Sequence, residues 1–85
     1  MNPKYAAIHK FICDIAQNQR RQVVITETTE LIESQILDSV SLVRLILVIQ
    51  DQFGLEVSFA DLDRRNFTDL ATIGETIERL KRARD

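Results

Sequence analysis

The chain has 85 residues, of which 13 are acidic and 11 are basic, so that its net charge at pH 7 is −2. A chain of this length forms one domain near the lower limit for a single hydrophobic core, and it leaves little room for an enzyme with a deep pocket. We therefore expect residues 1–85 to form one domain without catalytic residues. The small net charge gives no reason to expect a nucleic-acid partner.

The cysteine and histidine content and the hydropathy exclude further classes of protein. The single cysteine, Cys13, cannot form a disulfide within these residues, and the single histidine, His9, leaves no ligand set for a structural zinc site. We expect Cys13 to be structural or incidental and not a nucleophile, and we expect His9 and Cys13 not to form a metal site. No segment has the length of a membrane span, and the N-terminus lacks the pattern of a secretory signal. We therefore expect a cytoplasmic monomer with no metal site and no membrane insertion.

The first predicted element is a helix that begins at Asn2-Pro3 and runs to about Gln17. Asparagine caps free N–H groups, and proline is tolerated in the first turn, where its missing N–H would be unpaired in any case. Apolar side chains recur behind them at helical spacing and form one face. They are Tyr5, Ile8, Phe11, Ile12 and Ile15.

A long polar connection is predicted next, from Asn18 to Thr29. Its one apolar stretch, residues 23–25, is expected to hold it to the core through Val23, Val24 and Ile25. Leu31 and Ile32 are expected to anchor the second half of the connection. The basic pair Arg20-Arg21 is interpreted as solvated loop charge.

The second predicted helix spans residues 39–53, and Gly54 follows it where a left-handed residue would end it. At about 100° per residue, one set of apolar side chains falls on a single side and is sufficient to face a core. This set consists of Leu42, Leu45, Ile46, Ile49 and Phe53.

The remaining elements complete a small helical bundle. Ser58 with Asp61 predicts the start of a short helical turn. A last helix is predicted to open with Thr68 or Asp69 as its cap, and Thr72 with Glu75 is a competing start. The apolar stripe of this helix consists of Leu70, Ile73, Ile77 and Leu80. The predicted fold class is therefore all-α, with three main helices and one short helix.

The second helix also carries a second apolar stripe. Val40, Val43 and Leu47 project to the far side, next to Arg44 and Asp51, where a solvated helix should be polar. Either the first helix or the long connection covers these side chains, or they form an exposed patch on which partner proteins dock.

Leu37-Asp38-Ser39-Val40 stands directly ahead of this helix. A serine at this place has its hydroxyl at the positive end of the helix dipole, beside backbone N–H groups that have no partner within the helix. Such a place can hold a phosphate. The same serine could also serve only as a helix cap.

The motif at residues 37–40, the helix behind it and its end at Phe53-Gly54 resemble the acyl carrier protein family. In that family an Asp-Ser-Leu-type motif receives 4′-phosphopantetheine on the serine. Residues 31–34 are similar to the segment that precedes the motif, and residues 67–73, together with Val57, are similar to the loop and last helix of the family. The resemblance thus covers nearly the whole chain.

This resemblance implies that the chain is a carrier and not an enzyme. A phosphopantetheinyl transferase, using coenzyme A and magnesium, would attach the arm to Ser39, and Asp38 would support the attachment. The thiol of the arm would hold acyl or aminoacyl groups as thioesters for an activating ligase and for a downstream synthase or transferase. The residues expected to bind partners are Leu37, Val40, Val43, Arg44 and Leu47.

Two departures from the family pattern refine this interpretation. Gln35 stands where the family often has glycine, and the second helix carries Ser41, Arg44 and Gln50 where fatty-acid carriers often have acids. Electrostatic steering to a basic synthase would be weak, which favours a specialised carrier, for example in secondary metabolism or for aminoacyl groups, over the housekeeping fatty-acid carrier. Leu62-Asp63-Arg64, with a phenylalanine after it, bears a weaker resemblance to D-alanyl carrier proteins.

The alternative function belongs to a different class. A small helical adaptor could bind a partner through Val40, Val43 and Leu47 without any modification of Ser39. The basic pair Arg64-Arg65 is interpreted as solvated charge in either case.

Overall fold

The computed structural model of the chain describes residues 5–58 and 62–84. It contains α1 (Ala6–Asn18), α2 (Ser39–Phe53), a short 3₁₀ helix η3 (Arg64–Phe67) and α3 (Leu70–Arg84). No strand occurs within these two ranges. The predicted all-α class, with three main helices and one short one, is confirmed.

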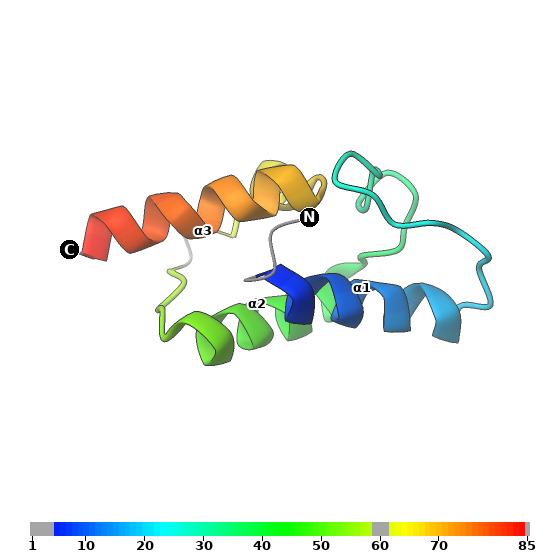
Figure 1. Cartoon of the computed structure of the whole chain (residues 1–85), viewed down its shortest axis with the longest axis horizontal. Coiled ribbons are helices and arrows are strands. Elements are labelled where there is room, and N and C mark those ends of the chain that lie inside the picture. Colours follow the sequence, from blue (N-terminus) through cyan, green and yellow to red (C-terminus); the bar gives the residue numbers. More distant parts are fainter. Residues whose placement is uncertain (1–4, 59–61, 85) are drawn as a thin grey trace.

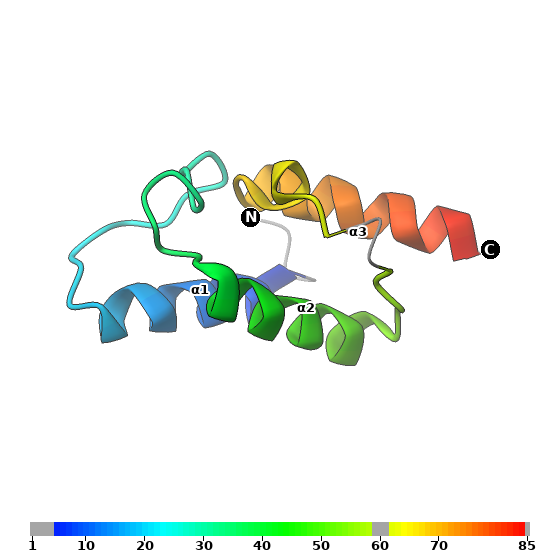
Figure 2. The same ribbon diagram turned by 180° about the vertical axis from the view of Figure 1, so that it is seen from behind.

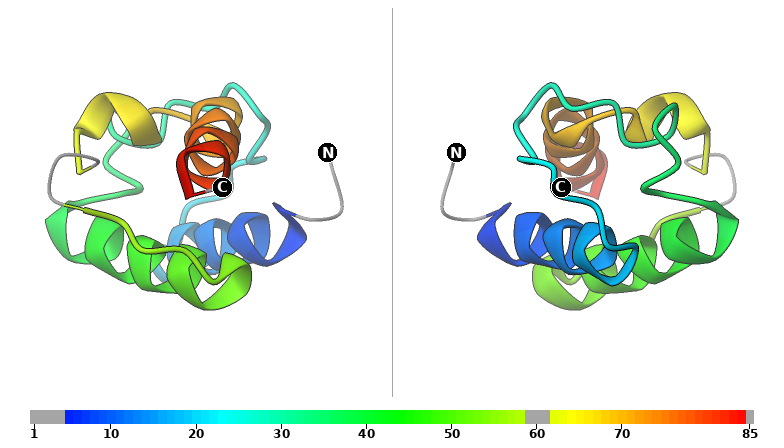
Figure 3. Two further views of the ribbon diagram at one scale, coloured as in Figure 1. Left: turned by 90° about the vertical axis from the view of Figure 1, so that its left-hand side faces the viewer. Right: turned by 90° about the vertical axis from the view of Figure 1, so that its right-hand side faces the viewer.

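The three long helices form two layers. Helices α1 and α2 lie side by side and run in opposite directions, and α3 lies on the other side of the core from this pair (Figures 1 and 2). The views along the long axis show the same arrangement, with α3 above the α1–α2 pair (Figure 3). The long connection leads from the C-terminal end of α1 to the N-terminal end of α2.

The core is formed by the inward face of each helix and by apolar residues of the connections. Ile12, Leu45 and Ile77, one from each long helix, are fully buried. The apolar stripes predicted for α2 and α3 are therefore confirmed, although Leu42 and Phe53 at the ends of the α2 stripe are only half buried. The connections add Ile25, Leu31, Ile36, Leu37 and Leu55 to the core.

The connection between α1 and α2 is tied to the bundle by backbone hydrogen bonds as well as by its buried side chains. The Leu31 N–H donates to the Thr68 carbonyl at 2.8 Å, and the Ala71 N–H donates to the Glu27 carbonyl at 3.0 Å. The His9 ring, on α1, contacts the Ile25 carbonyl through Nε2 at 3.0 Å. Because a carbonyl needs a donor, the Nε2-protonated tautomer fits this contact.

The prediction that Val23 and Val24 anchor this connection is wrong. Their side chains are 43% and 81% exposed, whereas Ile25 is 6% exposed. Backbone hydrogen bonds and Ile25 hold the segment, so the two valines need not reach the core. Leu31 is fully buried and Ile32 is half buried, so the predicted second anchor is confirmed.

Capping residues mark the start of α3 and the end of α2. The Asp69 carboxylate accepts a hydrogen bond from the Thr72 N–H at 2.8 Å, which selects Asp69 among the predicted caps of α3. Gly54 ends α2 with φ 62° and ψ 33°, as predicted. The first helix ends one residue beyond the predicted Gln17.

Two of the predicted starts fall on parts of the chain that are not described. The start at Asn2-Pro3 lies outside the described residues, as does Asp61 of the Ser58 pair. The short helix itself begins at Arg64, capped by Asp63. None of the helices in the described ranges combines the length and hydropathy that a membrane span needs.

Candidate functional site

Asp38 caps the N-terminus of α2. Its backbone is extended, with φ −99° and ψ −173°, and its Oδ1 accepts a hydrogen bond from the Ser41 N–H at 2.8 Å. This hydrogen bond, with that of the Ser41 hydroxyl as a second cause, lowers the pKa of Asp38 below its ordinary value. The carboxylate is therefore negatively charged at neutral pH, where it complements the positive end of the helix dipole.

Ser39 is the first residue of α2 and is exposed. Because Asp38 supplies the cap, the Ser39 hydroxyl is left without that role. In the described part of the chain this hydroxyl makes no hydrogen bond. The interpretation of Ser39 as only a helix cap is therefore wrong, and its oxygen is accessible to a modifying enzyme.

The turn that leads into α2 is fixed by buried neighbours. Ile36 and Leu37 are 1% and 2% exposed, and the Leu37 N–H donates to the Leu31 carbonyl at 2.9 Å. Gln35 adopts the left-handed conformation, with φ 63°. The position at which the carrier family often has glycine is thus a position that favours glycine here.

Leu37 was predicted to bind partners, and its burial corrects this. A side chain that is 2% exposed and packed in the core presents almost no surface to another protein. Its role is to fasten the motif to the bundle, one residue before the Asp38 cap. The buried Leu37 and the exposed Ser39 therefore divide the motif into an anchor and an accessible hydroxyl.

A surface depression of about 320 Å³ lies beside Ser39. Its charged lining residues are Asp38 from the α2 cap and Arg64 from η3. The remaining lining residues are Ile32, Gln35, Leu37, Ser39 and Leu42. The depression thus offers a polar surface next to the hydroxyl at the start of α2.

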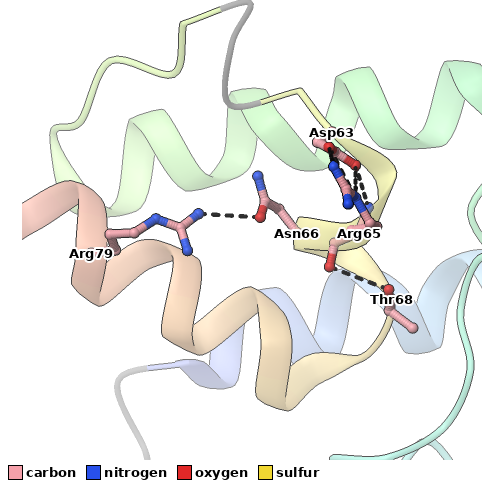
Figure 4. Close-up of polar contacts among 5 residues, drawn as sticks. All are labelled: Asp63, Arg65, Asn66, Thr68 and Arg79. Atoms are coloured by element: carbon pink, nitrogen blue, oxygen red, sulfur yellow. Dashed lines mark hydrogen bonds and ion pairs between the residues drawn. The ribbon is translucent and has the colours of Figure 1, made fainter.

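Arg64 is the residue of this site that the sequence interpretation missed. It stands next to Arg65 in the sequence, and the two were treated as equivalent loop charges. The structure separates them, because the Arg65 guanidinium pairs with the Asp63 carboxylate at 2.7 Å (Figure 4) while Arg64 lines the depression. Asp63 two residues before Arg65 was the only local signal of this difference.

The second apolar stripe of α2 is exposed. The side chains of Val40, Val43 and Leu47 are 65%, 57% and 57% exposed. The explanation that α1 or the long connection buries them is therefore wrong. Arg44 and Asp51 are exposed on the same side. Beside Val43 and Leu47 lies an apolar hollow of about 240 Å³ that Ile46, Gln50, Val57 and Leu62 also line.

His9 and Cys13 lie away from this site and serve the packing of the connection. The Cys13 Sγ is 3.5 Å from the His9 Nε2, which also contacts the Ile25 carbonyl. Burial raises the pKa of the Cys13 thiol, with Asp14 as a second cause. The thiol is therefore protonated at neutral pH and is a poor nucleophile.

Residues 7–80 match the family model described as phosphopantetheine attachment site. The match covers most of the chain, so the chain belongs to this family, whose members carry covalent 4′-phosphopantetheine. Carrier domains of this family work with transferases and synthases, and they are generally not catalytic themselves. No solved structure matches the chain.

Ser39 and its surroundings are compatible with such an arm. Attachment requires an accessible hydroxyl, and a phosphate is favoured at the N-terminus of a helix. Ser39 offers the exposed hydroxyl at the start of α2, and the adjoining depression leaves space beside it. Ser34, which precedes it in the same region, instead donates its hydroxyl to the Glu30 carbonyl.

Proposed function

We propose that the chain is a carrier protein whose Ser39 bears the 4′-phosphopantetheine arm. The observation that carries this proposal is the exposed Ser39 hydroxyl at the first residue of α2, free of hydrogen bonds among the described residues. When attached, the arm supplies a terminal thiol that holds acyl or aminoacyl groups as thioesters. The domain itself then performs no chemical step and presents the thioester to other enzymes.

Asp38 is proposed to have two roles. Its Oδ1 caps α2 and so fixes the backbone of the residue that bears the arm. The exposed, ionised carboxylate is also a ligand that the magnesium of a bound transferase would accept. The negative charge, which the lowered pKa favours, strengthens the cap and is required for the second role.

The exposed side of α2 is the proposed docking surface for these enzymes. We call Val40, Val43 and Leu47 the α2 patch. The patch begins one residue after Ser39 and extends along two turns of the same helix. An enzyme that binds the patch therefore lies next to the residue to which the arm is attached. Exposed apolar side chains on one rigid helix provide such anchors, with Arg44 at the rim to discriminate between partners.

We further propose that the partners are those of a specialised pathway. An acyl- or aminoacyl-activating ligase would load the arm, and a synthase or transferase would unload it. The exposed polar residues of α2 include Arg44 as well as Asp51, so this helix lacks the run of acids that would steer it to a basic synthase patch. Recognition would then depend mainly on the α2 patch.

The docking surface is tested with a broad-specificity phosphopantetheinyl transferase as the probe. Leu47→Asp should lower kcat/KM for arm attachment about tenfold or more, because a charge replaces an apolar anchor. Val24→Asp is the matched control, since Val24 is an exposed valine outside the α2 patch. Equal rates for the two variants would contradict the proposed surface.

The adaptor alternative predicts a different result in the same experiment. A folded wild-type chain would then gain no arm from coenzyme A, magnesium and the transferase. The observation that supports this alternative is the exposed α2 patch, because an unmodified adaptor could bind a partner through the same side chains.

A further inference from the structure

The depression beside Ser39 contains one carboxylate and one guanidinium. Asp38 contributes the carboxylate and Arg64 the guanidinium, and the other lining side chains are neutral. Within the described residues Arg64 forms no ion pair with Asp38 or with any other acid. An exposed guanidinium is therefore available in the lining of the depression, beside the start of α2.

Arg64 is available because Arg65 pairs with Asp63, the acid that precedes Arg64 in the sequence. Arg65 donates to Asp63 through Nη2 at 2.7 Å and through Nε at 3.1 Å, and its backbone N–H donates to the same carboxylate at 2.9 Å (Figure 4). The hydrogen bonds from Arg65 lower the pKa of Asp63 to about 2. The Asp63 carboxylate is thus paired with Arg65 and not with Arg64.

The short helix that carries Arg64 is held firmly against α3. Phe67 is 1% exposed, and the buried Thr76 hydroxyl lies 3.1 Å from the Asn66 carbonyl. Arg79 donates to the Asn66 side chain at 3.1 Å (Figure 4). Packing and hydrogen bonds on the α3 side thus fix the backbone from which Arg64 reaches the depression.

We propose that Arg64 binds the phosphate of the arm on Ser39, and this inference rests on the proposed attachment at Ser39. A phosphodiester there adds a second negative charge beside the Asp38 carboxylate, and the two repel each other. Arg64 is the one base among the lining residues that the structure describes, so it offsets this repulsion. A guanidinium also matches phosphate oxygens with paired N–H donors, which an ammonium group does not.

The consequence is a contact between two elements that are distant in the sequence. We call this contact, between the Arg64 guanidinium and the phosphate on Ser39, the clasp. The start of α2 bears the phosphate, and η3 supplies the cation that holds it. The root of the arm is thereby tied to the wall of the depression, while the thiol end remains free to reach other enzymes. Modification should accordingly couple η3 to α2.

The experiment compares the apo and arm-bearing proteins by NMR, after intact mass has shown one arm per chain. The Nε–H signal of Arg64, identified by its absence in Arg64→Gln, should shift on modification, whereas that of Arg65 should not. The ³¹P signal of the phosphodiester should differ between wild type and Arg64→Gln. Arg65→Gln is the matched control and should leave the ³¹P signal near its wild-type position.

Salt provides an independent readout of the ion pair. At about 1 M salt the Debye length is about 3 Å, so the ³¹P difference between wild type and Arg64→Gln should shrink. Arg64→Lys should retain only part of the wild-type ³¹P shift, because it keeps the charge without the paired donors. If Arg64→Gln fails to fold, the same comparison is made with Arg64→Lys.

The outcomes separate the two proposals. An arm on Ser39 with unchanged Arg64 Nε–H and ³¹P signals overturns the clasp and leaves the carrier function intact. Equal ³¹P changes in Arg64→Gln and Arg65→Gln also overturn it, since a general loss of positive charge would then explain them. A folded protein that never gains the arm overturns both proposals.

Discussion

The Asp38 carboxylate accepts the backbone N–H of Ser41 at 2.8 Å, and this one hydrogen bond assigns different roles to adjacent residues. Asp38 becomes the cap of α2, and Ser39 becomes the first residue of the helix with its hydroxyl exposed. Capping would otherwise engage a serine hydroxyl with backbone N–H groups. The aspartate therefore leaves the serine available for modification.

Substitutions at Asp38 should separate capping from charge. Asp38→Asn keeps an acceptor but loses the charge, so at neutral pH its Tm should lie below that of the wild type and above that of Asp38→Ala, which should lower Tm by about 5 °C. The pKa of Asp38 is lowered in the folded state, so its charge stabilises the fold above the unfolded-state pKa of about 4. That contribution is lost as the pH falls through the lowered folded-state pKa.

The measurement is the difference in Tm between wild type and Asp38→Asn, recorded by circular dichroism from pH 7 to pH 2. The asparagine variant has no titrating group at this position, so other carboxylates cancel in the difference. The wild-type advantage should be constant down to about pH 5 and should decline below it. A difference that stays constant to pH 2 would contradict the assignment.

Arg20→Gly should stabilise the fold. The Arg20 N–H donates to the Gln17 carbonyl and the Arg21 N–H to the Ala16 carbonyl, the Schellman pattern in which the residue after the C-cap is left-handed. Arg20 occupies that position with φ 59°. Glycine removes the strain and loses some of that gain to unfolded-chain entropy, for a net effect of about 0.5–1 kcal/mol.

The control for this prediction is Arg20→Ala, which also removes the side chain but retains a Cβ. Chemical denaturation should place the free energy of unfolding of Arg20→Gly above those of both the wild type and Arg20→Ala. If Arg20→Ala gains as much as Arg20→Gly, relief of charge repulsion and not of backbone strain is responsible.

Replacing Gln35 with glycine should also stabilise the fold, because the φ of Gln35 is 63°. Tm should be highest for Gln35→Gly, lower for Gln35→Asn and lowest for the wild type, because asparagine tolerates the left-handed region better than glutamine does. The span of this series should be about 2–5 °C. Thermal melts of the three proteins check it, and a glycine variant less stable than the wild type would show that the turn is not strained.

Thr76 links α3 to the short helix that carries Arg64. It is 2% exposed, and its Oγ1 lies 3.1 Å from the Asn66 carbonyl and 2.9 Å from the Thr72 carbonyl. Thr76→Val keeps the shape but removes the donor, so the free energy of unfolding should fall by about 1–2 kcal/mol. Thr76→Ser keeps the hydroxyl and should retain more stability than Thr76→Val in urea denaturation; the reverse order would mean that packing dominates at this position.

The sequence was sufficient for those features that depend on local pattern. The 3.6-residue periodicity of α2 and α3 identified their core-facing residues, and Gly54 marked the end of α2. The second stripe on α2 was visible for the same reason. Its exposure was not, because whether Val40 and Leu47 are covered depends on where the long connection runs.

The features that were missed depend on contacts between distant residues. Val24 is apolar and stands in a short apolar stretch, yet backbone hydrogen bonds from Leu31 and Ala71 hold the connection instead. Arg64 and Arg65 are identical in type and adjacent, and only the position of Asp63 distinguishes them. Leu37 was assigned to a partner surface because its motif is functional, but the fold uses it as an anchor.

The central claim is the attachment of the arm at Ser39, and intact-protein mass spectrometry tests it most directly. Wild type, Ser39→Ala and Ser41→Ala would each be incubated with coenzyme A, magnesium and a broad-specificity phosphopantetheinyl transferase. We expect wild type and Ser41→Ala to gain one arm and Ser39→Ala to gain none. A gain that persists in Ser39→Ala, or no gain in folded wild-type protein, would contradict the account.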